Sequence, residues 1–327
     1  MQKRRIIPTT KTNLRHLWLD KLGGIETVSV RNKEWLTLLK EDTRNSLMIE
    51  GYFVSRTELK EAIENPKYTK VGYKVLGYFD AAVASYELAF QQYKSNEFRV
   101  TKSIIRQIHS MMFRGDPNFP YPPGEWRKGE LEITGAKIKT ASPFRVERYI
   151  ENLIDIVNRP DENLIRKVAV IHDMFEQIHP FPDGNGRVGR ILLNFILVGH
   201  GLPNIAIKGS EINKKIYISA LEEADLIVSD ILSGRGKKET FSKPLIQLED
   251  LINKSLAIAM DVIICNRYDK IKKLMPINEV ARILNKPIES VRVACSQKKH
   301  ICSTIDGVVK THPDLLEPPK QSFGQMQ

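Results

Sequence analysis

Hydrophobic residues recur with a helical period through most of the chain. In the clearest example, the apolar positions are spaced by four and three residues: Leu164, Val168, Ile171, Phe175 and Ile178. This spacing places apolar side chains on one face of a helix. Similar patterns, and a capping box at its start in one case, predict helices over residues 35–49, 55–63, 71–93, 101–113, 146–157, 191–198, 211–230 and 244–273. The pattern therefore predicts a mainly α-helical protein.

The segment around Gly135 is an exception, because apolar and polar residues alternate there as they do in a β-hairpin. It follows a stretch rich in proline and aromatic residues, 117–123, that excludes regular structure. The alternating residues are Leu131, Glu132, Ile133, Thr134, Gly135, Ala136, Lys137 and Ile138. We therefore expect a small β-hairpin within the helical part of the chain.

The C-terminal end of the chain has a different order of elements. Residues 277–284 and 288–297 predict two short helices, joined by a tight turn that contains Pro287. Residues 301–310 predict a hairpin around Asp306-Gly307. Two helices followed by a hairpin predict a winged helix-turn-helix module.

Changes in composition divide the chain into four expected segments. Residues 234–238 form a basic, glycine-containing patch that is typical of an exposed linker. We expect an N-terminal helical region at 1–100, a core at 101–235, a helical connector at 236–273 and the winged helix-turn-helix at 274–327.

The composition argues against an exported or membrane-spanning protein. Three cysteines among 327 residues, without CxxC spacing, do not suit a disulfide framework and favour a reducing compartment. No apolar run approaches the ~20 residues that a membrane helix needs, and the basic N-terminus leads to Pro8 rather than to an apolar segment. We therefore expect a cytoplasmic protein with no membrane contact.

Positive charge is concentrated near the C-terminus. The chain carries 50 basic and 39 acidic residues, a net charge of +11, and residues 270–310 hold nine bases against three acids. Such a surface suits DNA, although a solvated face or a protein-binding surface has the same composition. The residues of the second short helix that could contact bases are Glu289, Ser290, Arg292 and Gln297.

One stretch combines residues that few structural needs would bring together. Residues 179–190, called the signature below, read His-Pro-Phe-Pro-Asp-Gly-Asn-Gly-Arg-Val-Gly-Arg. The prolines end the preceding helix, and the glycines let the backbone turn tightly and approach a ligand. The apolar run that follows predicts a buried helix, whose N-terminal N–H groups favour an anion. Arg187 and Arg190 share one face of its first turn, where they could hold different phosphates of one ligand.

Other kinds of site suit the signature less well. A zinc site would need His172 and Asp183 beside His179, but His172 is seven residues away and no further nitrogen or sulfur ligand is near. The chain lacks the GxxxxGK[ST] sequence of a P-loop and the GxSxG sequence of a serine hydrolase. An anion site beside a histidine is the interpretation that we favour.

The signature resembles, at every defining position, the HPFx(D/E)GNGRxxR motif of Fic-domain proteins, which are AMP-transferring enzymes. The resemblance extends over about residues 30–235. Within it, the sequence SLMIEG from Ser46 to Gly51 resembles the inhibitory (S/T)xxxE(G/N) motif of the family. Ser46 and Glu50 are four residues apart and so share one face of the helix predicted there.

The resemblance implies a role for each residue of the signature. His179 would act as general base on a target hydroxyl, which attacks the α-phosphorus of ATP. Asp183 would hold Mg²⁺, an ion that prefers one or two carboxylates together with phosphate oxygens. The residues that would bind the phosphates of ATP are Gly184, Asn185, Gly186, Arg187 and Arg190.

The resemblance also implies an inhibitory contact and a docking segment. Glu50 would pair with Arg190 and place negative charge where the γ-phosphate belongs, so that ATP binds unproductively. Residues 131–138 correspond in position to the flap of the family, which aligns a target segment by strand addition. A plain surface hairpin is the alternative for these residues.

The sequence thus predicts a Fic-type helical core with a small hairpin flap, followed by a winged helix-turn-helix. We expect a protein adenylyltransferase (AMPylase) that moves AMP from ATP to a Tyr, Thr or Ser hydroxyl of a protein target, the enzyme itself included, and that is inhibited by Glu50. Three alternatives stay open: a DNA-binding regulator with a nucleotide-sensing core, a bifunctional enzyme that also removes AMP, and transfer of another group such as another nucleotide, phosphate or phosphocholine. A homo-oligomer is compatible with the sequence.

Overall fold

The computed structural model describes residues 10–25, 32–66, 69–131, 140–160, 163–232 and 244–319. Within these ranges the chain forms two compact units. The first contains residues 32–252, and the second combines residues 10–25 with residues 253–319. The four segments expected from composition do not coincide with these units, because an N-terminal helix belongs with the C-terminal residues.

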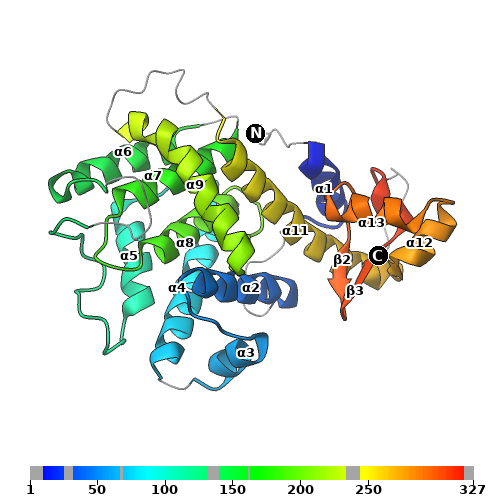
Figure 1. The fold of residues 1–327 in the computed structure, drawn as a ribbon, viewed down its shortest axis with the longest axis horizontal. Coiled ribbons are helices and arrows are strands. Elements are labelled where there is room, and N and C mark those ends of the chain that lie inside the picture. The colour runs from blue at the N-terminus through cyan, green and yellow to red at the C-terminus, as the bar shows by residue number, and fades with distance from the viewer. Residues whose placement is uncertain are drawn as a thin grey trace. The chain divides into compact units, whose positions relative to one another are not determined.

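The first unit is built from helices, as the hydrophobic pattern predicts (Figure 1). Their order is α2 (Lys33–Ile49), α3 (Arg56–Glu64), α4 (Lys70–Ser95), α5 (Lys102–Phe113), the 3₁₀ turn η1 (Pro143–Arg145), α6 (Val146–Asn158), α7 (Leu164–Ile178), α8 (Asn185–Val198), α9 (Glu211–Leu232) and α11 (Ile246–Ile271), which continues into the second unit. Most of them begin and end within a few residues of the predicted ranges, whereas α8 starts earlier than the apolar run that predicted it. The mainly α-helical fold is confirmed.

Polar side chains at helix N-termini explain where several helices begin. Asn32 accepts hydrogen bonds from the N–H groups of Glu34 and Trp35 at the start of α2. Ser55 and Glu58 form the predicted capping box of α3, in which each side chain accepts from the backbone N–H of the other residue. Both arrangements satisfy N–H groups that have no partner inside the helix.

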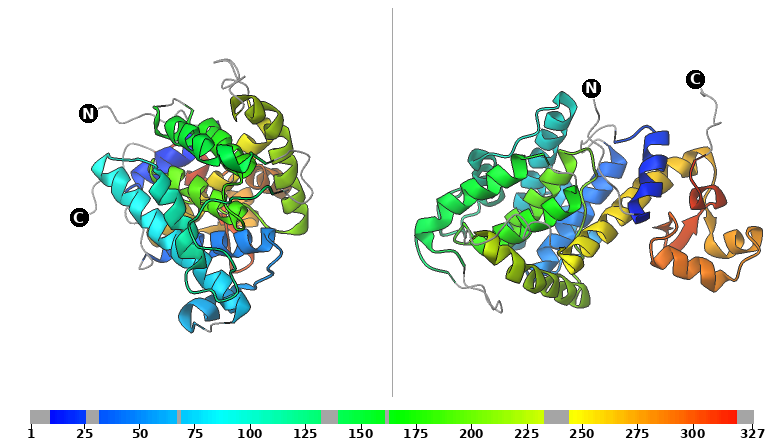
Figure 2. Two further views of the ribbon diagram at one scale, coloured as in Figure 1. Left: turned by 90° about the vertical axis from the view of Figure 1, so that its left-hand side faces the viewer. Right: turned by 90° about the horizontal axis from the view of Figure 1, so that it is seen from above.

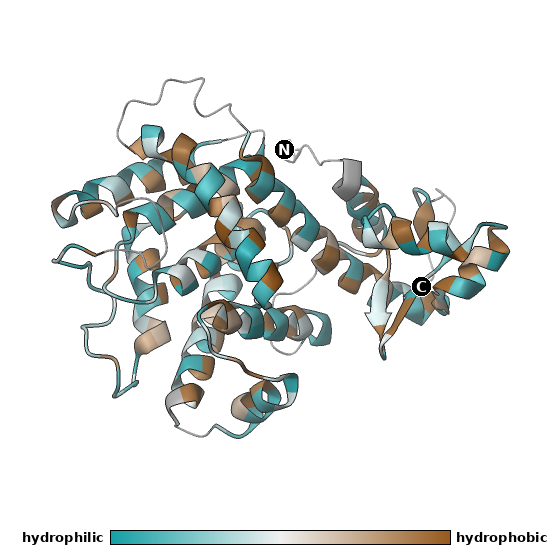
Figure 3. Cartoon of the chain, in the orientation of Figure 1, coloured by the Kyte–Doolittle hydropathy of each residue, from teal (hydrophilic) through white to brown (hydrophobic). Residues whose placement is uncertain are grey.

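Helix α8 is the centre of the first unit. All of its residues except Gly186 are buried, and it packs against α4, α5 and α7. The same helices can be followed from two further sides in Figure 2. Figure 3 shows brown and teal positions alternating along the helices, as expected for amphipathic helices around a core. A helix packed on all sides holds the groups at its N-terminus in fixed positions.

The second unit contains the two helices and the hairpin expected at the C-terminus, together with a short strand before them and a 3₁₀ turn after them that the pattern did not predict. They are β1 (Met275–Pro276), α12 (Ile277–Ile283), α13 (Ile288–Ser296), β2 (Ser303–Ile305), β3 (Val308–Thr311) and the 3₁₀ turn η2 (Pro313–Leu316). The strands form an antiparallel sheet in the order β1-β3-β2, with Met275 opposite Thr311 and Thr304 opposite Val309. The function of the second unit as a winged helix-turn-helix, and any contact of this unit with DNA, remain predictions.

Helix α1 (Thr10–Lys21) was not indicated by the hydrophobic pattern. One reason is that its buried face includes Arg15, whose Nε donates to the Asp261 carboxylate at 2.7 Å and whose Nη2 donates to the His300 carbonyl at 3.1 Å. Trp18 packs edge-on against Tyr268. A face that buries a charge interrupts the apolar period by which amphipathic helices are found. Among the described residues, every helix is too short or too polar to cross a bilayer.

Candidate catalytic and nucleotide-binding site

The signature forms the loop between α7 and α8. His179 ends α7 in the left-handed region (φ 49°, ψ 59°), and its N–H donates to the Phe175 carbonyl at 3.0 Å. Gly184 precedes α8 with a φ of 82°. A Cβ on Gly184 would lie 2.6 Å from the Phe113 ring, so the backbone conformation and the packing both require glycine here. These two left-handed residues, His179 and Gly184, mark the two ends of a short loop, so the histidine lies close in the chain to the first turn of α8.

Side chains inside the loop hold its shape. The Asn185 amide accepts from the Phe181 N–H and donates to the Phe181 carbonyl, both at 2.8 Å. The buried Phe181 ring stacks on His109, with ring centroids 3.9 Å apart. Because the loop itself occupies the Asn185 side chain, this residue would meet a ligand through its backbone N–H.

The His179 ring is arranged as a base. Its Nδ1 lies 3.2 Å from the Glu176 carbonyl oxygen, which can only accept a hydrogen bond. Nδ1 therefore carries the proton, and Nε2 keeps its lone pair. Burial and the nearby Arg127 guanidinium lower the pKa of His179 below its usual value, so the ring is neutral at pH 7. The arrangement can accept a proton from a hydroxyl.

The N-terminus of α8 offers donors to an anion. The first bond of this helix runs from the Val188 N–H to the Gly184 carbonyl, at 3.0 Å. The N–H groups of Asn185, Gly186 and Arg187 therefore have no acceptor within the helix, and the helix dipole adds positive potential. These properties suit a phosphate group.

Arg187 adds a buried cation to the same place. It is 2% exposed, and its guanidinium lies over the Phe113 ring at 4.9 Å. Its Nη2 is 3.5 Å from Oδ1 of Asp183, while its Nε has no hydrogen-bond partner among the described residues. A buried donor without a partner is costly, so this group fits an anionic ligand.

Arg190 is held by the two residues of the predicted inhibitory motif. Its Nε donates to Oγ of Ser46 at 2.7 Å, and its Nη2 donates to the Ser46 carbonyl at 3.2 Å and to Oε1 of Glu50 at 2.7 Å. Burial alone would raise the pKa of Glu50, but the guanidiniums of Arg190 and Arg187 outweigh it and hold that pKa below its usual range. Glu50 is therefore ionised at neutral pH. A Cβ on Gly186 would lie 2.8 Å from Oε1 of Glu50, so the carboxylate reaches the first turn of α8.

Asp42, a buried carboxylate one helical turn before Ser46, fixes α2 in this position. Asp42 accepts from Tyr78 Oη at 3.1 Å, from Tyr86 Oη at 2.6 Å and from Nδ2 of Asn194 at 3.3 Å. Asp42, Ser46 and Glu50 follow one another at intervals of four residues and so lie on one face of α2. This face is the one that meets α4 and α8.

Asp183 is the candidate ligand for Mg²⁺. Its side chain is 53% exposed, and its Oδ1 accepts from the Gly184 N–H. Among the described residues, no group of three or more His, Cys, Asp or Glu side chains is placed to hold a metal. One exposed carboxylate beside a phosphate site nevertheless fits Mg²⁺, which takes most of its other ligands from water and phosphate.

His109 and Arg127 support the loop, and the sequence pattern indicated neither. Nδ1 of His109 accepts from the Gly124 N–H at 2.8 Å, so its Nε2 donates to the Asp183 carbonyl at 3.1 Å. Burial lowers the pKa of His109 to about 4, which keeps the ring neutral. Its position among the buried residues of α5 could have drawn notice, whereas Arg127 lies in an irregular segment with no pattern to mark it. The predicted flap, apart from Leu131, lies outside the described residues.

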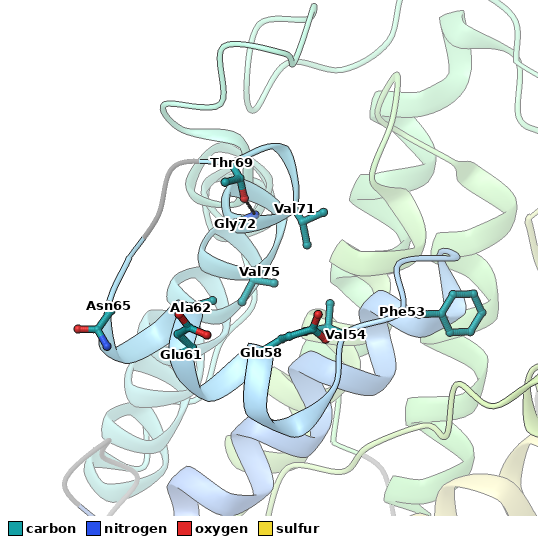
Figure 4. Close-up of a pocket in the computed structure, with 10 residues that line it drawn as sticks. All are labelled: Phe53, Val54, Glu58, Glu61, Ala62, Asn65, Thr69, Val71, Gly72 and Val75. Carbon is teal, nitrogen blue, oxygen red and sulfur yellow. Dashed lines mark hydrogen bonds between the residues drawn. The ribbon is translucent and has the colours of Figure 1, made fainter.

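A cavity of about 330 Å³ lies apart from this loop, between α3 and α4 (Figure 4). Its lining combines valine side chains with polar groups of α3, such as Glu58 and Glu61. No residue of the signature lines it. We therefore assign it no part in the chemistry of the signature.

Comparison with known proteins identifies the helices around the signature. Residues 99–197 match the model of the Fic/DOC family, which covers α5 to α8 and the loop between α7 and α8. The chain contains a Fic domain. The Fic domain therefore includes His109, Arg127 and every residue of the signature, whereas Ser46 and Glu50 precede it.

Two relatives of this Fic-domain protein are named as adenylyltransferases. The probable protein adenylyltransferase aq_aa38 of Aquifex aeolicus is 37% identical over 224 residues, covering 67% of this chain and 65% of that protein. Protein adenylyltransferase fic-1 of Caenorhabditis elegans is 34% identical over 104 residues, covering 30% of this chain and 20% of that protein. The chain thus spans less than two thirds of the length of either relative.

Solved structures share the fold. A Fic domain containing signaling protein from Bacteroides thetaiotaomicron superimposes with a TM-score of 0.62 at 22% identity, covering 78% of this chain and 96% of that chain. Fic-1 from C. elegans superimposes with a TM-score of 0.56 at 18% identity, covering 80% of this chain and 72% of that chain. At these identities the likeness concerns the fold alone.

Proposed function

We propose that this protein transfers AMP from ATP to a hydroxyl group of a protein target. One observation carries the proposal: a single loop holds a neutral histidine, with Nε2 free to accept a proton, next to an anion site at the α8 N-terminus. The adenylyltransferase names of two relatives support the same activity.

The proposed reaction is one displacement at phosphorus. The target oxygen bonds to the α-phosphorus of ATP, the bond from that phosphorus to the pyrophosphate oxygen breaks, and Nε2 of His179 takes the hydroxyl proton. The N–H groups at the start of α8, together with Arg187 and Arg190, would bind the phosphates and stabilise the charge that develops on them. Asp183 would hold Mg²⁺, which when bound offsets negative charge on the phosphate oxygens.

We infer that Glu50 inhibits this transfer. Its contact with Arg190 at 2.7 Å supports the inference, because the same guanidinium is needed by a phosphate of ATP. The ionised carboxylate also reaches the first turn of α8, where it would repel a phosphate. Release of Glu50 is therefore the step that would allow ATP to bind productively.

The proposed target is a protein segment with an exposed Tyr, Thr or Ser hydroxyl. Residues 131–138 would align it by backbone pairing, which requires little side-chain specificity. We place the reaction in the cytoplasm, where the three buried cysteines, all free, would stay reduced. Contact of the second unit with DNA is a separate proposal, supported by the nine basic residues of 270–310, among which Arg292 is paired with Glu289 at 2.6 Å.

The test is incubation of wild type and Glu50→Gly with Mg²⁺ and each nucleoside triphosphate, followed by mass spectrometry of the protein and of added lysate proteins. We expect the mass of AMP on hydroxyl side chains, mainly with Glu50→Gly and ATP, and none after chelation of Mg²⁺. ATP binding by Glu50→Gly without any covalent product would instead favour a nucleotide-sensing regulator. A different added mass would show that another group is transferred.

A further inference from the structure

The guanidinium of Arg127 donates hydrogen bonds to backbone carbonyls at the end of α7 and in the segments before and after the proposed flap. Its Nε donates to the His179 carbonyl and its Nη1 to the Gly129 carbonyl, both at 2.7 Å. Its Nη2 donates to the Ile178 carbonyl at 3.3 Å and to the Ala141 carbonyl. Arg127 is only 4% exposed. One buried cation thus joins three separate parts of the chain.

The bonds to residues 178 and 179 explain why a cation is placed here. The last carbonyls of a helix have no N–H partner within it, and positive charge stabilises this end of the helix dipole. Arg127 meets both needs at the end of α7, and its own N–H donates to the Pro180 carbonyl at 2.9 Å. His179 is thereby held in a left-handed conformation that few residues other than glycine adopt.

The same charge acts on the His179 ring. The charges of Arg127, of Glu50 at the end of α2 and of Asp183 in the loop act on this ring, and the Glu176 carbonyl of α7 accepts from its Nδ1. Burial lowers the pKa of His179 most and the Arg127 guanidinium lowers it further, while the hydrogen bond to the Glu176 carbonyl and the two carboxylates act in the opposite direction. A cation already present at the end of α7 therefore opposes protonation of the histidine.

The remaining two bonds reach residues that flank the proposed flap in the sequence. Gly129 precedes residues 131–138, and Ala141 follows them. The Ala141 N–H also donates to the Gln177 carbonyl at 3.2 Å, so this residue is fastened to α7 as well. Gly129 and Ala141 are thus both joined to the end of the helix that carries His179.

We propose that Arg127 is a positioning residue, whose hydrogen bonds and charge set the orientation and the electrostatic environment of His179 and hold Gly129 and Ala141 to the end of α7. The catalytic part of this inference rests on the proposed AMP transfer. The effect on the His179 ring is independent of any activity.

The test is an NMR titration of the histidine ring carbons, in which the His179→Ala variant assigns the His179 signal. Arg127→Met removes the charge, while Arg127→Lys keeps it and loses the planar fork. We expect the pKa of His179 to rise by about 0.5 to 1 unit in Arg127→Met, as for the loss of one nearby charge in a partly solvated site, and by less in Arg127→Lys. Arg106→Met is the matched control, because Nε of Arg106 donates to the Gly124 carbonyl at 2.7 Å and to no carbonyl of α7.

A second measurement is the pH dependence of AMP transfer in the Glu50→Gly background. The kcat value should fall about 10- to 100-fold in Arg127→Lys, because a misplacement of about 1 Å can have that effect. The acid limb of the profile should move to higher pH in Arg127→Met and by less in Arg127→Lys, since a base with a raised pKa is protonated at higher pH. The KM for ATP should change less than about twofold in either variant.

An unchanged pKa of His179 in a folded Arg127→Met protein would overturn the proposal, whether or not transfer is detected. Transfer that is lost in His179→Ala but kept within about twofold in both Arg127 variants would overturn it and leave the proposed function intact. If Arg127→Met does not fold, Arg127→Gln is titrated in its place and the same outcomes decide.

Discussion

The two ends of the signature each depend on a buried arginine, and the two arginines have different partners. Arg127 donates to backbone carbonyls, which cannot leave without unfolding the loop. Arg190 donates to Ser46 and Glu50, which belong to a helix outside the Fic domain. The first arrangement is suited to holding a geometry. The second is suited to regulation, because a carboxylate can be exchanged for a phosphate.

The largest effect on activity is expected at the end of the signature that carries His179, the proposed base. His179→Ala removes the proton acceptor, so AMP transfer in the Glu50→Gly background should fall by about 10²- to 10⁴-fold. Labelled ATP incorporation measures this loss, with His200→Ala as the control because His200 bonds to the Ile196 carbonyl at the far end of α8. Transfer that persists at the same rate would remove His179 from the chemistry.

A change in buried charge should affect stability rather than activity. Burial raises the pKa of Asp42 to about 7, even though two tyrosines and an asparagine donate to it. The folded protein therefore keeps a proton on Asp42 at pH values where the unfolded chain has lost it, and this proton stabilises the folded state. The stabilisation is present at acid pH and is lost as the pH rises through about 7. Between pH 5 and pH 8, wild type should therefore lose about 2 to 3 kcal/mol more of its free energy of unfolding than Asp42→Asn does.

Urea denaturation of both proteins at the two pH values measures this difference. The exposed Asp155→Asn on α6 is the control and should follow wild type. Parallel pH dependence of wild type and Asp42→Asn would mean that the Asp42 carboxyl does not change its proton affinity on folding.

The smallest of the three effects is expected from Ser46→Ala. This change removes the partner of the Arg190 Nε at 2.7 Å but leaves the ion pair with Glu50. One hydrogen bond to a charged group contributes about 1.5 to 3 kcal/mol, of which only part opposes ATP, so transfer should rise by less than about tenfold. A rise in AMP transfer as large as that of Glu50→Gly would mean that the serine, and not the carboxylate, is the inhibitory group.

Much of the first unit could be predicted because its helices are amphipathic and their ends carry capping residues such as Ser55. The signature likewise places His179 at the end of one helix and Arg190 near the start of the next, since a helix end, two turns and a helix start follow one another in the sequence. Helix α1 could not be predicted, because Arg15 on its buried face is neutralised by a residue 246 positions away. Arg127 escaped notice for a similar reason: its partners are backbone carbonyls, which no sequence pattern marks.

The contact between Ser46, Glu50 and Arg190 was expected from a resemblance, not from the pattern of residues. A serine and a glutamate four residues apart occur on many exposed helix faces. What distinguishes this pair is the buried anchor at Asp42, which holds the same face of α2 against α4 and α8. The sequence alone does not reveal this anchor, because Asp42 meets the tyrosines of α4 only in the folded structure.

The central claim is that Glu50 occupies the place of the γ-phosphate, and calorimetric titration with ATP and with ADP tests it most directly. Wild type and Glu50→Gly are compared with Mg²⁺ present, and glycine is tolerated because Glu50 is the C-cap of α2. Glu50→Gly should bind ATP about tenfold or more tightly than wild type and bind ADP nearly unchanged, since only ATP brings a phosphate to Arg190. An equal gain for ADP and ATP, or no gain for either, would contradict the claim.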